Sequence, residues 1–390
     1  MVSARHQPIP TVRVGVPLPG GQLVAAARDK GYPVLFSANA FARTWPRGHE
    51  REGFFKGFRL PDPAQFDGLD AALDSAGFVA AVRYGDYRWT VEDYFDLVQA
   101  YPWAWYAAMD YCCEPQIAQD RPLRLLRMAA TAYMLGQCRK EASDRQLPPP
   151  MPVLQGWTPD EYATCAAWLP LMEWPDLVGL GSVCRRPVHG DTGILAILEA
   201  VDQVLPAHVR LHLFGVKSTA LERLASHHRV ASVDSMAWDV QARAERRTGR
   251  DMAFRISHMA AWADRQRSIA ARSRAAMSVQ TMLFDPAEFG GFSSTDELVM
   301  EAAALQYADL VMGGDLEYRD AVHYCHQDGT IALAIARRNG LSAEMLAECD
   351  DMLEGFGTRI SNLQESWGAG CTALPSPFGP ERTSHATAAA

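Results

Sequence analysis

Short apolar runs alternate with longer segments of helical periodicity along most of this 390-residue chain. Parallel strands need crossover connections, which are usually helices, so this alternation predicts a parallel sheet covered by helices. The runs expected to form strands are residues 12–17, 34–38, 71–74, 103–110, 151–155, 177–181, 210–215 and 230–234. The segments expected to form helices between them are residues 21–30, 91–100, 122–141, 159–171, 194–204 and 218–227. Thr158 is the expected cap of the helix that starts at residue 159. Eight alternating strands predict an α/β fold of the (β/α)8 TIM barrel class, and a doubly wound open sheet is the alternative.

Polar residues stand at the carboxyl ends of several expected strands. Asp74, Asp110, Gln155, Gly181 and Asp234 all follow apolar runs. Burying an unpartnered carboxylate costs several kcal/mol, so repeated aspartates at such positions indicate one shared site. Barrel enzymes collect their chemistry at the carboxyl ends of different strands, which favours the barrel. The glycines after the first expected strand match the dinucleotide-binding fingerprint too weakly to favour the open sheet.

Composition places the chain among ordinary globular enzymes, with 48% hydrophobic and 21% charged residues. The sequence has neither a run of eighteen apolar residues nor the pattern of a secretory signal, so we expect a cytoplasmic protein without membrane contact. The eight cysteines are scattered and do not suggest a disulfide framework.

The net charge of −9 argues mildly against a protein that coats nucleic acid, but one segment is strongly basic. Residues 243–274 hold nine arginines and three acidic residues, a pattern typical of contact with a polyanion or of a solvated helix. The arginines expected to bind nucleic acid are Arg243, Arg246, Arg247, Arg250 and Arg255.

The pattern changes after residue 237, where helical segments follow without strands. We expect a catalytic barrel over residues 1–280 that includes an arginine-rich insertion at 240–280. A C-terminal helical extension is expected at 281–374, with helices near 296–312, 329–339 and 342–356. Residues 375–390 are rich in Pro, Ser, Thr and Ala, and are expected to form a disordered tail.

Asp74 and Asp234 form a candidate catalytic pair if their strand ends face each other. Displacement at a sugar anomeric carbon uses two carboxylates, one to attack or shield the cationic centre and one to move a proton. For either aspartate alone, a helix cap or a loop salt bridge is an equally good interpretation.

A planar heterocycle would suit the other strand ends. Asp110 can accept hydrogen bonds from an N–H pair, and Gln155 offers both a donor and an acceptor to a purine edge. The Gly-Leu-Gly run at 179–181 lets backbone N–H groups approach a ring closely. Phe78 or Tyr111 is available for stacking, with core packing as the alternative role.

The order of these segments resembles the tRNA-guanine transglycosylase superfamily. In that family several segments follow one another on a (β/α)8 barrel. They are an Asp-Ser-Gly-Gly-Phe segment, a guanine-binding Asp, a Val-Gln-Gly segment, a Gly-Leu contact, a Tyr/Leu-Phe-Gly-Val strand and a Phe-Asp-Ser or Phe-Asp-Cys nucleophile segment. The corresponding segments here are Asp74-Ser75-Ala76-Gly77-Phe78, Asp110, Val153-Leu154-Gln155-Gly156, Gly179-Leu180-Gly181, His212-Leu213-Phe214-Gly215-Val216 and Ser232-Val233-Asp234-Ser235. Each match is weak alone, but the matches stand in the family's order.

The resemblance implies a glycosyltransferase that exchanges bases on a nucleic acid. It implies that Asp234 attacks C1′ and expels guanine, and that Asp74 handles protons during the exchange. The residues expected to hold guanine or a 7-deazaguanine are Asp110, Gln155, Gly156, Gly179, Leu180, Gly181, Phe78 and Tyr111. The target nucleotide must leave its stack to reach such a pocket.

Three departures from the family pattern matter. Ala76 replaces a glycine, and Val233 stands where the nucleophile segment usually has Phe. The zinc signature of the tRNA enzymes, three closely spaced cysteines and a later histidine, is absent, so no cofactor is assigned. Zinc candidates that lack the usual spacing are His323, Cys325, His326 and Cys349.

Without that metal signature the chain looks like the divergent branch that inserts 7-deazaguanines into DNA. The leading hypothesis is therefore exchange of guanine in DNA for a 7-deazaguanine such as 7-cyano-7-deazaguanine (preQ0), with helper proteins that give access to the duplex. The alternatives are the same chemistry on tRNA, a non-catalytic nucleic-acid-binding paralogue, and a sugar-processing barrel hydrolase.

Overall fold

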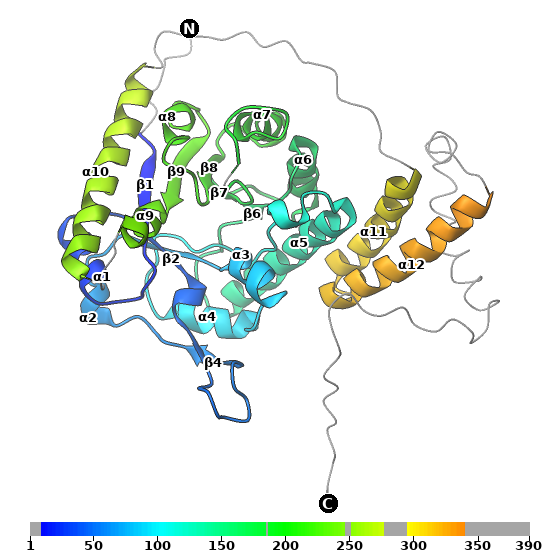
Figure 1. The fold of residues 1–390 in the computed structure, drawn as a ribbon, viewed down its shortest axis with the longest axis horizontal. Coiled ribbons are helices and arrows are strands. Elements are labelled where there is room, and N and C mark those ends of the chain that lie inside the picture. Colours follow the sequence, from blue (N-terminus) through cyan, green and yellow to red (C-terminus); the bar gives the residue numbers. More distant parts are fainter. Residues whose placement is uncertain (1–8, 185, 246–250, 277–294, 340–390) are drawn as a thin grey trace, which may run out of the picture.

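Seven parallel strands form a curled sheet at the centre of the molecule (Figure 1). The computed structural model describes residues 9–184, 186–245, 251–276 and 295–339. The strands of this sheet are β1 (Thr11–Gly15), β2 (Val34–Ser37), β5 (Ala71–Asp74), β6 (Val153–Leu154), β7 (Leu177–Leu180), β8 (Arg210–Leu213) and β9 (Val230–Ser235). Their spatial order is β5-β2-β1-β9-β8-β7-β6, so the first and last strands of the chain are neighbours. A separate antiparallel pair consists of β3 (Ala42–Thr44) and β4 (Phe55–Phe58).

Helices follow most strands and cover the outside of the sheet (Figure 1). In the first half of the chain they are α1 (Gln22–Asp29), α2 (Pro63–Phe66), α3 (Gly77–Val79), α4 (Val91–Gln99) and α5 (Arg121–Asp144). In the second half they are α6 (Pro159–Trp168), α7 (Ile194–Val204), α8 (Leu221–Leu224), α9 (Ala237–Glu245), α10 (Met252–Ala276), α11 (Thr295–Gly313) and α12 (Tyr318–Asn339). Three short turns are η1 (Ala38–Ala40), the π-helix η2 (Ala80–Tyr84) and η3 (Pro115–Ile117).

The strand expected at 103–110 is present only as two isolated bridges. Tyr106 bridges to Leu73 on β5, and Ala107 bridges to Met151 just before β6, both in parallel. The N–H of Ala107 donates to the Leu73 carbonyl at 2.9 Å, and that of Ala108 donates to the Met151 carbonyl at 2.9 Å. These contacts establish a mixed α/β fold with a curled, half-barrel sheet, and the closed barrel stays a prediction.

Because the seven strands are parallel, their carboxyl ends share one edge of the sheet. Asp74 is the last residue of β5 and pairs in register with Ser37 at the end of β2. Gln155 follows β6, and Asp234 is the penultimate residue of β9. The fold thus brings strand ends that are distant in sequence to the same edge.

Two helices begin with reciprocal caps, one of which the sequence predicts. The expected cap before residue 159 is confirmed: Thr158 accepts from the Glu161 N–H, and the Glu161 side chain accepts from the Thr158 N–H. Thr90 and Asp93 form the same reciprocal pair at the start of α4. Each such cap stabilises its helix by about 1 kcal/mol because it satisfies otherwise unpaired backbone donors.

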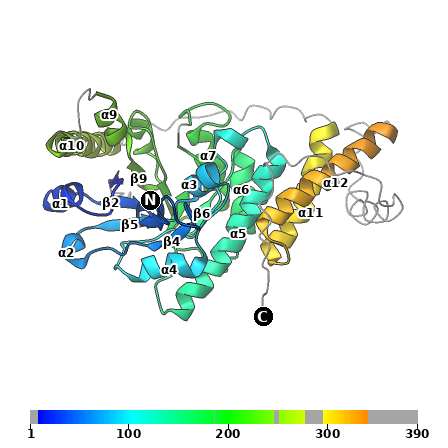
Figure 2. The same ribbon diagram turned by 60° about the horizontal axis from the view of Figure 1, so that its bottom comes forward.

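The helices α11 and α12 lie beside α5, on the side of the molecule away from α10 (Figures 1 and 2). Arg121 on α5 forms an ion pair with Glu301 on α11 at 2.8 Å. The helix expected near 342–356 and the tail expected at 375–390 lie outside the described residues, so the domain boundaries stay predictions. Within the described residues, no helix has the length and apolarity needed to cross a membrane.

Candidate active site

Asp74 is held at the carboxyl end of β5 by a tight turn. The N–H of Ala76 donates to Asp74 Oδ2 at 3.1 Å. Ala76 adopts a left-handed conformation with φ of 72°, which is why a glycine would fit this position better. The turn fixes the carboxylate, and the alanine carries backbone strain beside it.

Asp110 is buried among polar partners. Its Oδ1 accepts from the Ser75 hydroxyl at 2.7 Å, and its Oδ2 accepts from Gln155 Nε2. The Tyr87 hydroxyl lies 3.0 Å from Ser75 Oγ, accepts from the Asp110 N–H at 3.0 Å and lies 2.9 Å from the Asp110 carbonyl oxygen. Asp110 and Gln155, expected to recognise one base, therefore touch each other directly.

Gln155 links Asp110 to the end of β7. Its Oε1 accepts from the Ser182 hydroxyl at 2.6 Å, and Ser182 Oγ accepts from the Cys113 N–H at 2.6 Å. Ser182 has a φ of 54°, an uncommon backbone conformation for a residue with a Cβ. Strained backbone of this kind persists where the surroundings enforce it, often at functional sites.

Two glycines leave room for these side chains. A Cβ on Gly77 would lie 2.7 Å from Asp110 Oδ1, and a Cβ on Gly181 would lie 2.2 Å from Gln155 Nε2. Both distances are far below van der Waals contact, so glycine is required at each position by Asp110 and Gln155.

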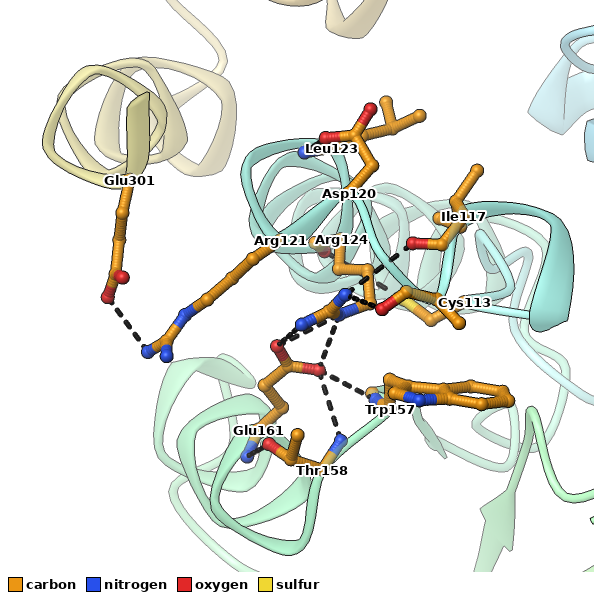
Figure 3. A network of polar contacts seen from close by, with 12 residues as sticks. Cys113, Ile117, Asp120, Arg121, Leu123, Arg124, Trp157, Thr158, Glu161 and Glu301 are labelled. Carbon is orange, nitrogen blue, oxygen red and sulfur yellow. Dashed lines mark hydrogen bonds and ion pairs between the residues drawn. The ribbon is translucent and has the colours of Figure 1, made fainter. Parts of the chain in front are cut away.

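The loop after Gln155 is supported by a buried ion pair (Figure 3). Arg124 on α5 pairs with Glu161 on α6 at 2.8 Å, and their side chains are only 6% and 3% exposed. Glu161 also accepts from the N–H groups of Trp157 at 2.7 Å and Thr158 at 3.3 Å. Arg186 donates to the carbonyl oxygens of Gly156 and Trp157. The loop is thus fixed by two buried guanidinium groups.

Asp234 is held on one oxygen. Its Oδ1 accepts from the Gly215 N–H at 2.8 Å and lies 3.4 Å from His212 Nε2. His212 is fully buried, its Nδ1 lies 2.7 Å from Ser232 Oγ, and its Nε2 makes no well-aligned hydrogen bond within the described part of the chain. Burial lowers the pKa of His212 although Asp234 opposes this effect, so the imidazole is neutral at neutral pH and does not hold Asp234 in an ion pair.

Two neighbouring carboxyl groups act on Asp74 at this edge. Burial, followed by the charges of Asp110 and Asp234, raises the pKa of Asp74 to about 8, against the lowering effect of the hydrogen bond from the Ala76 N–H. Burial also raises the pKa of Asp110 to about 6, against the lowering effect of its hydrogen bonds from Ser75 and Gln155. Asp74 is therefore mostly protonated at neutral pH, whereas Asp110 is mostly ionised.

The other residues expected to hold a base differ in accessibility. Phe78 is 38% exposed, whereas Leu180 is buried and offers only its backbone. Gly156 packs against the start of α6, where a Cβ would lie 3.0 Å from the Tyr162 nitrogen, and a Cβ on Gly179 would lie 2.6 Å from the Phe214 ring. These glycines are explained by packing.

Tyr111 is buried and lies against the C-terminal helices. Its hydroxyl donates to Asp86 Oδ1 at 2.7 Å, and its ring lies 4.5 Å from that of Tyr318 on α12. Arg319 pairs with the other oxygen of Asp86. Tyr111 therefore joins the site to α12 instead of presenting an open face.

The arginines expected to bind nucleic acid are only partly described. Arg255 is 7% exposed and its guanidinium pairs with Asp239, so the expected phosphate contact does not fit its position. Arg243 is half-exposed and pairs with the same Asp239 at 3.1 Å. Arg246, Arg247 and Arg250 lie outside the described residues.

The zinc candidates on α12 do not converge. Cys325 is buried, whereas His323 and His326 are exposed. Cys349 lies outside the described residues. Across the described ranges, no three His, Cys, Asp or Glu side chains are grouped closely enough to hold a metal ion.

Four further residues contribute to the site without having been predicted from the sequence: Ser75, Tyr87, Ser182 and His212. Ser75 and His212 stand inside segments that carry the family resemblance, and that was the available signal. Tyr87 and Ser182 reach the site through turns whose course no sequence pattern revealed.

Comparison with known proteins supplies one match. A family model described as DpdA, DeoxyPurine in DNA protein A, matches residues 58–305. No curated protein matches this chain.

Proposed function

The chain belongs to the DeoxyPurine in DNA protein A family of DNA 7-deazaguanine transglycosylases, and on that premise we propose that it exchanges guanine in DNA for a 7-deazaguanine through a covalent bond between Asp234 and C1′. The observation that carries the proposal is the placement of Asp74 and Asp234 at the carboxyl ends of parallel strands, where the charges of Asp110 and Asp234 help to raise the pKa of Asp74. Two carboxyl groups of unequal proton affinity are what displacement at an anomeric carbon requires.

Asp234 is the nucleophile in this proposal. The Gly215 N–H and His212 both face Oδ1, so the attack on C1′ is assigned to Oδ2. The C1′–N9 bond breaks as the new C1′–O bond forms, and its electron pair leaves with guanine. With the Ser232 hydroxyl donating to Nδ1, neutral His212 carries its proton on Nε2 and positions the carboxylate.

Asp74 supplies and recovers the proton. Because its pKa is raised to about 8, Asp74 is protonated at neutral pH and can give its proton to the departing guanine. The resulting carboxylate then takes the N9 proton of the incoming deazaguanine, whose N9 attacks C1′ and releases Asp234. The proton balance closes after each exchange.

Asp110 and Gln155 recognise the base in this proposal. The carboxylate of Asp110 can accept from the N1–H and amino group of guanine, and the Gln155 amide can pair with the same polar edge. Their present bonds to each other and to Ser75 keep the buried polar atoms satisfied until a base replaces them. The exposed face of Phe78 is assigned to stacking.

We also infer that the curled sheet closes into a barrel through residues 104–108. This segment donates backbone hydrogen bonds to β5 at Ala71 and Leu73 and to the residue 151 carbonyl before β6. It thereby contacts both edges of the seven-stranded sheet. Closure brings Asp110 between the ends of β5 and β6, as the base site requires.

The test is incorporation of labelled 7-cyano-7-deazaguanine into a polymer by the full chain, with duplex DNA, single-stranded DNA and tRNA in parallel. We expect label in DNA and none in tRNA. Label in tRNA only would reassign the substrate, and label in neither polymer, with the labelled base or with labelled guanine, would contradict base exchange.

A further inference from the structure

The hairpin of β3 and β4 is a basic and aromatic projection on an acidic protein. We define the arm as residues 42–60, and it extends from the body beyond α4 (Figure 1). It carries five exposed cationic side chains and two acidic ones. The cations are Arg43, Arg47, Arg51, Lys56 and Arg59. This surface is separate from the arginines of α9 and α10.

The arm begins close to Asp74, the proposed proton donor. Ser37, the last residue of β2, pairs in register with Asp74, and the arm follows after only a short turn. From the other direction, the Tyr87 ring lies 5.6 Å from Trp89, and Trp89 lies 5.3 Å from Phe58 in the arm. Since Tyr87 also bonds to Asp110, the rings of Trp89 and Tyr87 connect the arm to the base site.

The cations of the arm differ in their partners from the arginines that form ion pairs in the body of the protein. Within the described ranges, none of the five forms an ion pair with a carboxylate, and Lys56 instead lies 4.4 Å from the centre of the Trp45 ring. Arg124, Arg229 and Arg255, by contrast, are each paired with an acid. Unneutralised cations on one surface attract a polyanion, because phosphate binding releases condensed counterions.

The arm also exposes a large apolar side chain. Phe54 is 65% exposed, although its neighbour Phe55 packs against Trp89 and anchors the base of the arm. Arg88 donates to the Gly53 carbonyl at 2.6 Å and fixes the turn that presents Phe54. An exposed aromatic ring among cations suits insertion between bases.

We propose that the arm is a DNA-binding element, in which the cations hold the phosphates flanking the target nucleotide and Phe54 fills the gap that the extruded base leaves in the stack. This proposal rests on the proposed function, because base exchange inside a duplex requires the target nucleotide to be extruded. It assigns the phosphate contact to a different surface from the arginines expected from sequence.

The binding test compares two double variants with the same change of charge. Arg47→Ala/Arg51→Ala removes cations from the arm, and Arg265→Ala/Arg272→Ala removes exposed cations from α10. Fluorescence anisotropy with a labelled DNA duplex should show an affinity loss on the order of tenfold, and a smaller salt dependence, for the arm variant only. Equal losses in both variants, no loss in the arm variant, or no DNA binding by the wild type would overturn the proposal.

The stacking test uses Phe54→Ala, with Met172→Ala as a control at another exposed apolar residue. We expect Phe54→Ala to slow exchange about tenfold on a duplex while sparing a single-stranded substrate, because only the duplex needs a filled gap. Equal slowing on both substrates, or no slowing on the duplex, would overturn the role of Phe54. If the wild type exchanges no base on any DNA, the proposed function fails, while the anisotropy comparison still decides whether the arm binds DNA.

Discussion

The α5–α6 junction and the carboxyl edge of the sheet both bury charged side chains, but they do so in opposite ways. At the junction, Arg124 and Glu161 neutralise each other and share their remaining bonds with backbone groups. At the sheet edge, Asp74, Asp110 and Asp234 lie together, and the charges of the other two raise the pKa of Asp74. Removing a charge at the junction should therefore destabilise the protein. Removing a carboxylate at the sheet edge should lessen the repulsion there but reduce activity.

The largest expected effect is on activity at the sheet edge. Asp234→Asn keeps the shape and the bond from the Gly215 N–H but removes the nucleophile, so exchange should fall by about a thousandfold or more. Steady-state incorporation of labelled base measures this, with thermal unfolding as the control for folding. Exchange within a few-fold of the wild type would remove Asp234 from the role of nucleophile.

At the junction the expected effect is on stability. Glu161→Ala leaves the Arg124 guanidinium buried without its partner and removes the cap of α6, so the free energy of unfolding should fall by about 3–5 kcal/mol. Chemical denaturation measures the loss, and Asp144→Ala, which removes an exposed ion pair with Lys140, serves as the matched control with a much smaller loss. A similar, small loss in both variants would show that the junction is not held by the buried pair.

Asp74→Asn should separate stability from activity. The pKa of Asp74 is about 8 in the folded state and 3.8 in its ordinary state. Between these pH values the folded protein holds a proton on Asp74 that the unfolded chain has lost. The contribution of Asp74 to the free energy of unfolding therefore declines as pH rises from about 4 to about 8. The variant should therefore unfold at a higher denaturant concentration than the wild type above pH 8, by on the order of a few kcal/mol, and lose this advantage near pH 4.

The same proton sets the pH dependence of exchange. Wild-type exchange should decline as pH rises above about 8, where Asp74 no longer carries the proton for guanine. Asp74→Asn should be inactive at every pH. A stability gain that is independent of pH would contradict the raised pKa of Asp74.

Two substitutions of His212 should sharpen the account of Asp234. In His212→Gln an amide nitrogen can replace Nε2 beside Asp234, whereas in His212→Asn the amide can replace only Nδ1 beside Ser232. We expect His212→Asn to lose about tenfold in the rate of single-turnover exchange and His212→Gln to recover most of that loss. Equal rates for the two variants at equal stability would limit His212 to packing.

The smallest expected effect concerns the strained turn beside Asp74. Ala76→Gly relieves the positive φ of 72° and should stabilise the fold by about 0.5–1 kcal/mol, with exchange retained. Differential scanning calorimetry measures the change. A destabilised variant would show that the Ala76 methyl group contributes more by packing than the backbone strain costs.

Sequence reasoning predicted the elements whose signals are local. The strand ends at Asp74 and Asp234 and the cap at Thr158 follow from apolar runs and capping chemistry within a few residues. The arm was missed because its strands have only three and four residues, which is too short to show an alternation of apolar and polar side chains. Its pairing depends on packing against Trp89, far along the chain.

Partners that are distant in sequence explain the other differences. Arg255 was expected to meet phosphate because its segment is basic, but a single acid, Asp239, neutralises it within the fold. His212 resembled an ordinary core residue, since Ser232 and Asp234 come from the next strand. The helix expected from residue 329 starts earlier, at Tyr318, whose ring packs on Tyr111.

The most direct test of the central claim is capture of the Asp234–C1′ bond. The full chain is mixed with a DNA duplex in the absence of a deazaguanine, denatured, digested and analysed by mass spectrometry, with Asp234→Asn as the control. The account predicts a deoxyribose adduct on the peptide that contains Asp234 in the wild type and none in the variant. An adduct on another residue, or active exchange with no adduct at any time point, would contradict it.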